Sequence, residues 1–106
     1  MIQREWLPCS VYRLSNYVDE YGQRRTAYTD IVQEEIVIKP YREKTANDPR
    51  YLETEWIGLI KGQYGPNDII KIGETYYRIL DTIWSIKFQQ VFLKETTERP
   101  TLYTGG

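Results

Sequence analysis

The chain has 106 residues, a formal net charge of −1 and a pI near 5.5. This length suffices for one small domain and excludes a second hydrophobic core. The charge argues against a free-standing nucleic-acid binder, whose affinity would come mainly from Lys and Arg contacts to phosphates.

The first predicted element is a β-hairpin. Residues 9–15 and 26–32 are rich in Val, Tyr, Thr, Ile and Leu, which favour strands. Residues 16–23 between them are polar and contain a glycine, as turns do.

A third strand and a long polar loop follow the hairpin. Residues 34–41 alternate between two faces, and Pro40 ends the pattern because it cannot donate a hydrogen bond to a sheet. Residues 42–50 hold charges of both signs and a proline, so they cannot bury an apolar face. The charged and amide side chains of this loop are Arg42, Glu43, Lys44, Asn47, Asp48 and Arg50.

Two further groups of strands complete the predicted sheet. Residues 53–61 alternate as a fourth strand, and Gly and Pro follow it closely. Residues 68–81 predict two short strands joined around Gly73 and Glu74, at hairpin spacing. Four of their side chains are expected to share the core face: Ile70, Ile72, Tyr77 and Ile79.

The end of the chain is less regular. Residues 82–88 also fit helical spacing, although a turn followed by a last strand at 89–95 fits better. Short strands separated by turns predict an all-β fold, a small β-barrel of SH3-like or OB-like size. We expect one domain over residues 1–106, with a core at about 9–95, extended terminal arms and the long polar loop between strands 3 and 4.

The chemical inventory argues against an enzyme. The chain has no histidine, which removes the commonest general base and transition-metal ligand. The single cysteine, Cys9, is predicted to be buried in a strand, and Glu53 and Glu55 are predicted to be solvated. We therefore expect no catalysis, no metal and no cofactor.

Targeting signals are missing as well. The first eight residues lack the apolar run of a signal peptide, and no stretch approaches the roughly 20 apolar residues that span a bilayer. We expect synthesis in a reducing cytoplasm and no membrane contact.

Aromatic residues are the most promising candidates for binding. Ten Tyr, three Trp and two Phe are present, and such side chains are enriched at protein interfaces. A stacking platform for single-stranded nucleic acid is the alternative, and the charge disfavours it. The predicted interface residues are Tyr12, Tyr28, Trp56, Tyr76 and Trp84.

The order of these elements carries a family resemblance. It combines an opening hairpin at 11–26, a Val-Ile-Lys-Pro segment at 37–40 before a polar loop, and a Glu-Thr-Glu-Trp-Ile strand at 53–57. An Asp, apolar, turn, Tyr, apolar pattern at 68–81 and a closing strand at 90–95 follow. In this order the chain resembles the head-tail joining family of tailed bacteriophages, especially the head-closure (stopper) proteins of the phage neck.

The resemblance implies a structural virion protein. It implies a homo-oligomeric ring, twelvefold, between the portal and adaptor above and the tail proteins below. Double-stranded DNA would pass through the lumen without sequence specificity, facing the loop at 41–52. Sparse cations among carboxylates suit such a loop, because they would not hold the DNA tightly.

Two alternatives stay open from the sequence. The chain could be another phage connector, either an adaptor or a tail-completion protein. It could also be an OB-like or SH3-like module that binds single-stranded nucleic acid or peptides.

Overall fold

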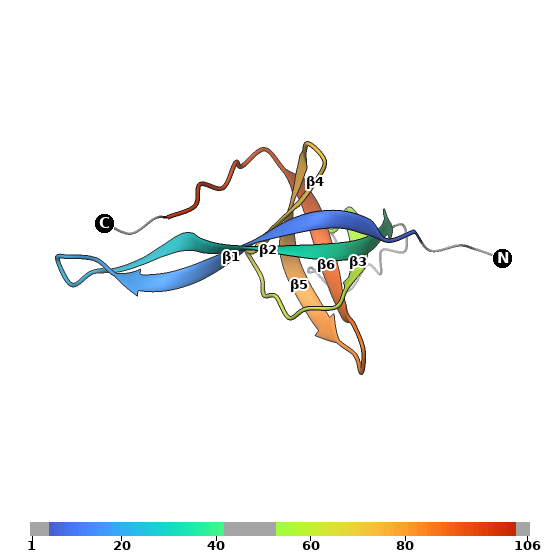
Figure 1. Cartoon of the computed structure of the whole chain (residues 1–106), viewed down its shortest axis with the longest axis horizontal. Helices are drawn as coiled ribbons and strands as arrows, with labels where there is room; N and C mark the ends of the chain where they lie inside the picture. The colour runs from blue at the N-terminus through green and yellow to red at the C-terminus, as the bar shows by residue number, and fades with distance from the viewer. Residues whose placement is uncertain (1–4, 42–52, 104–106) are drawn as a thin grey trace.

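The computed structural model describes residues 5–41 and 53–103, and over these residues the protein is an all-β barrel, as predicted (Figure 1). No helix long and apolar enough to cross a membrane occurs in the described ranges. The strands are β1 (Leu7–Val18), β2 (Arg24–Pro40), β3 (Trp56–Ile60), β4 (Ile69–Ile72), β5 (Thr75–Trp84) and β6 (Gln89–Thr96).

The six strands close in the order β1-β2-β3-β6-β5-β4, and every pair is antiparallel. A short pairing of β1 with β4, from Ser10↔Lys71 to Tyr12↔Ile69, closes the barrel. Closure removes the open sheet edges from the barrel itself, although the part of β2 that extends beyond the barrel keeps one edge without a paired strand. The core cluster inside it consists of Cys9, Val11, Ile36, Ile60, Tyr64, Ile70, Ile79, Val91 and Leu93.

The predicted inward face of β4 and β5 is confirmed. Ile70 and Ile79 are fully buried, and Ile72 and Tyr77 pack against the core cluster. Alternation of apolar residues was sufficient to identify this face because both strands have one side in the core.

Strand β2 corrects one prediction. The second and third predicted strands are a single strand, Arg24–Pro40, and the expected break after Val32 is wrong. β2 pairs with β1 from Arg24 to Ile36 and with β3 from Ile36 to Pro40, so one strand serves both a hairpin and the barrel wall. The alternation of apolar and polar residues is irregular in β2 because the strand changes its partner there, and not because the strand ends.

The long β1–β2 hairpin extends well beyond the barrel (Figure 1). A register shift between Arg13 and Leu14 lies where the hairpin leaves the barrel. Buried Asp68 secures this point, because its carboxylate accepts hydrogen bonds from Leu14 N at 2.7 Å and Gly65 N at 3.0 Å. We define the hairpin arm as residues 13–30, the part beyond this point.

The segment at 82–88 is a strand end and a turn, in agreement with the favoured prediction. β5 continues to Trp84, which pairs with Gln89 at the start of β6. Ser85 closes the turn, since its N and Oγ donate to Phe88 O at 2.9 and 2.7 Å. This β5–β6 hairpin is the second projection from the barrel (Figure 1).

Candidate functional site

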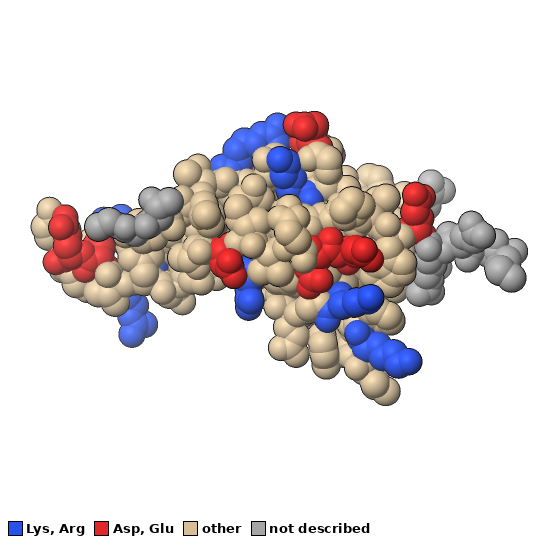
Figure 2. Space-filling view, viewed as in Figure 1, with Lys and Arg blue, Asp and Glu red and all other residues tan. Residues whose placement is uncertain are grey.

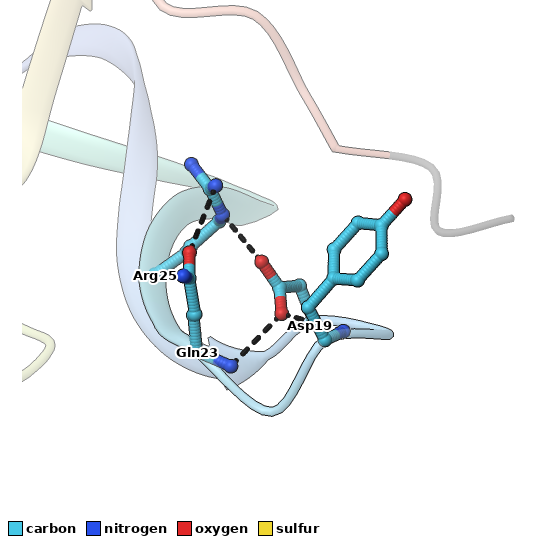
Figure 3. Close-up of polar contacts among 4 residues, drawn as sticks. Asp19, Gln23 and Arg25 are labelled. Carbon is cyan, nitrogen blue, oxygen red and sulfur yellow. Dashed lines mark hydrogen bonds and ion pairs between the residues drawn. The ribbon is translucent and has the colours of Figure 1, made fainter.

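The end of the hairpin arm is a turn held by hydrogen bonds and an ion pair (Figure 3). Gly22 has a φ of 77°, which a glycine adopts without strain. Asp19 Oδ1 accepts hydrogen bonds from the N atoms of Tyr21 and Gln23, both at 2.9 Å. Asp19 Oδ2 pairs with Arg25 Nε at 2.6 Å, and this hydrogen bond is the main cause that lowers the pKa of Asp19. The turn therefore keeps its shape while remaining exposed to solvent.

Large apolar side chains are exposed at this turn. Val18 is 65% exposed and Tyr21 is 80% exposed. Neither has a role in the core, so the turn presents apolar surface on a hydrogen-bonded support.

The β5–β6 hairpin ends in a second exposed apolar group, which we call the apolar tip: Ile83, Trp84 and Ile86. Their exposed fractions are 46%, 51% and 96%. Trp84 was predicted as an interface residue, whereas Ile83 and Ile86 were not. Ile86, which stands between polar Ser85 and Lys87 in a predicted turn, was the sequence signal that could have identified this group.

The other predicted interface aromatics lie in different places. Tyr12 and Tyr76 meet on the outside of the barrel, with ring centroids 6.3 Å apart. Lys71 Nζ and the Arg99 guanidinium lie 5.6 and 4.5 Å from the Tyr76 centroid. Trp56, in contrast, packs against the core and against Tyr77. The five residues therefore do not form one surface.

Tyr28, the fifth predicted aromatic, contacts the C-terminal strap, defined here as residues 98–103. Tyr103 N donates to Tyr28 O at 2.7 Å, and Leu102 forms a parallel bridge with Tyr28. The Tyr28 hydroxyl also lies 3.3 Å from a Glu98 carboxylate oxygen. The strap thus runs beside the outer part of β2, and the two are visible side by side in Figure 1.

The polar loop at 42–50 lies outside the described residues, and so do all six of its candidate side chains. The residues that flank it are defined. Pro40 pairs with Trp56, and Tyr41 N donates to Glu55 O at 3.0 Å. Tyr41 also packs edge-on against Phe92, with centroids 6.1 Å apart. The described residues on either side of the loop are therefore paired with each other.

Cys9 is a free, buried cysteine, as predicted. Burial, followed by the nearby charges of Glu34 and Glu35, raises the pKa of Cys9 to about 12. Tyr64 donates to Glu34 Oε2 at 2.6 Å, and burial and this bond raise the pKa of Tyr64 as well. A thiol that stays protonated near neutral pH cannot attack an electrophile. The described residues also contain no group of three or more metal-ligating side chains.

This burial predicts an alkaline loss of stability. The ordinary pKa of a cysteine, 9.0, is below that of folded Cys9, so the folded state binds the proton more tightly. Stability is complete below pH 9 and falls between pH 9 and 12. From pH 9 to 10 the free energy of unfolding should fall by up to about 1 kcal/mol. Urea unfolding should show a shallower fall in a Cys9→Ala variant, and equal slopes in the two proteins would contradict the assignment.

Charge is mixed on the face drawn in Figure 2, where small groups of acidic and of basic side chains both occur and neither sign covers the face. This agrees with the net charge of −1. A surface of this kind gives little nonspecific attraction to phosphates.

Comparison with family models, curated proteins and solved structures finds no match to this chain. The geometry of the projections is therefore the main basis for a functional proposal.

Proposed function

We propose that this protein is a structural subunit that self-assembles through its projections, forming a ring in the neck of a tailed-bacteriophage virion. One observation carries the self-assembly. All exposed large apolar side chains of the described residues lie on the two hairpin ends or the strap, and none lies on the barrel wall. They are Val18, Tyr21, Ile83, Trp84, Ile86, Leu102 and Tyr103.

Exposed apolar side chains that gather on projecting elements mark protein interaction sites more often than scattered ones do. The hairpin arm and the apolar tip also extend away from the barrel (Figure 1), which suits contacts with neighbouring subunits. A closed barrel with apolar projections supports an assembly role better than a pocket-based activity.

The assignment of this subunit to the phage neck rests on the family resemblance of the sequence. In this proposal, many copies form a ring, twelvefold by analogy, between the portal-adaptor and the tail. Double-stranded DNA crosses the lumen and meets the loop at 42–50. The mixed charge of that loop and of the visible surface supports passage without tight binding.

Removing apolar surface from the tip tests the self-assembly. A Trp84→Ser/Ile86→Ser variant is expected to weaken subunit association by at least about 100-fold, because two large side chains no longer become buried. Native mass spectrometry over a range of protein concentrations measures the oligomers. Because both side chains are exposed in the subunit, the urea midpoint should stay near that of the wild type at protein concentrations where both proteins are monomeric.

A Lys87→Ser variant is the matched control, since it changes the same turn without removing apolar surface. It should assemble like the wild type. Tyr12, Tyr76 and Lys71 give the nucleic-acid module its one supporting observation, an aromatic pair beside a cation. A wild-type protein that stays monomeric and binds single-stranded DNA only at low salt would overturn the ring and favour that module.

A further inference from the structure

The C-terminal strap contacts β5, the neighbour of the strand that carries it, and also the outer parts of β1 and β2, which do not pair with that strand. It follows β6, which ends at Thr96, yet its partners belong to β1, β2, β5 and the β4–β5 turn. Glu98 pairs with Arg78 and Tyr28, and Arg99 covers the Tyr76 ring. Its last described residue, Tyr103, stacks on Tyr17 with centroids 4.7 Å apart.

The strap occupies a groove without filling it. Strap residues and residues of β1, β2 and β5 line an open space between them, including Leu14, Ala27, Arg78, Thr101 and Leu102. Leu102 and Tyr103 remain 39% and 43% exposed although they are docked. The strap is therefore held by a few specific contacts and not by deep burial.

The strand edge beside the strap is otherwise open. β2 pairs with β3 only from Ile36 onward, and the single bridge between Tyr28 and Leu102 is the other pairing on that side within the described residues. An unpaired edge accepts extended segments by main-chain hydrogen bonds. The groove already shows which segment it accepts, namely residues 98–103 of this sequence.

We propose that in the assembled protein each strap docks in this groove on a neighbouring copy. The inference rests on the proposed self-assembly and names one contact within it. Exchange of identical segments needs no new complementarity, because every contact made within one chain is available between two. Once neighbours are held together by other surfaces, the entropic cost of docking in the adjacent groove has largely been met. The exchanged straps would link the subunits around the ring.

Disulfide trapping in the full-length chain tests the exchange. In a Cys9→Ala background, one variant carries Ala27→Cys in the groove and the other carries Thr101→Cys in the strap. These positions directly precede the bridged pair Tyr28 and Leu102, where parallel neighbours lie within disulfide reach. One variant is isotopically labelled, and the two are unfolded, mixed, refolded and oxidised. Mass spectrometry should find mixed disulfide dimers in at least about tenfold excess over same-variant dimers.

Two controls make the outcome decisive. Gln33→Cys, farther along the same β2 edge, should not crosslink to Thr101→Cys. The Ala27→Cys/Thr101→Cys double variant reports whether the strap docks at all.

A disulfide only within single chains, or no disulfide, overturns the exchange. Native mass spectrometry of the same mixture separates the two proposals. Oligomers without mixed disulfides overturn only strap exchange, whereas a protein monomeric at all concentrations also contradicts self-assembly.

Discussion

Replacing Gln89 by leucine is expected to lower the free energy of unfolding by about 2 to 5 kcal/mol. The buried Gln89 side chain makes two hydrogen bonds to one backbone residue. Tyr64 N donates to Gln89 Oε1, and Gln89 Nε2 donates to Tyr64 O, both at 2.8 Å. Leucine fills a similar volume but leaves both backbone groups of Tyr64 buried without these partners. Urea denaturation followed by circular dichroism measures the change.

The adjacent residue provides the control for this prediction. Gln90 is only half-buried and makes no such pair of bonds in the described structure, so Gln90→Leu should change stability by less than about 0.5 kcal/mol. The loop that carries Tyr64 also contributes Gly65, which donates to Asp68 beside the base of the hairpin arm. Loss of the Gln89 contact should therefore increase amide hydrogen exchange at residues 62–66 first. Equal stability of the two variants would show that Gln89 does not hold this loop.

Enlarging Gly58 is expected to have the second large effect. Gly58 is buried in β3, and a Cβ there would lie 2.8 Å from Ile36 Cδ1 and 3.1 Å from Val91 Cγ2. Overpacking of this kind costs about 1 to 3 kcal/mol for each added group that the core cannot accommodate. Gly58→Ala should therefore destabilise by about 1 to 2 kcal/mol and Gly58→Val by at least about 3 kcal/mol. Part of the destabilisation by Gly58→Ala is offset, because an unfolded chain with alanine at this position is less flexible than one with glycine.

A double variant identifies the cause of this loss. Ile36→Val removes the Cδ1 atom that the new Cβ would meet, and alone it should cost about 0.5 to 1.5 kcal/mol. Combined with Gly58→Ala, it should relieve the contact, so the double variant should be more stable than the sum of the two single losses by about 1 kcal/mol. Strict additivity, or an alanine variant as stable as the wild type, would exclude close packing at Gly58 as the cause.

Local pattern predicted most of the fold. The two short strands in residues 68–81, their inward face and buried Cys9 all followed from alternation and residue type. The break predicted within β2 was wrong, because alternation reports only which side of a strand is buried. The alternation pattern changes where β2 passes from the hairpin arm to the barrel wall, although the strand continues. Polar core residues such as Gln89 and Asp68 were missed, since nothing in the sequence indicates which distant backbone groups they bond.

The candidate site was predictable only in part. Composition indicated that aromatic residues would form contacts, and Trp84 does lie exposed on a projection. Trp56, from the same prediction, packs against the core. A half-buried strand presents its aromatics to either side, so the sequence could not separate them before the neighbours of β3 were known.

By itself, the sequence determined an all-β domain with a free, buried cysteine and no histidine, because residue types and their alternation act locally. Only the tertiary structure decided that the barrel closes by the short pairing of β1 with β4. It alone placed the exposed apolar residues on two projections and a strap, and it brought residues 98–103 to the open edge of β2. These features join residues far apart in the chain, and their free energy comes from partners that no local pattern identifies.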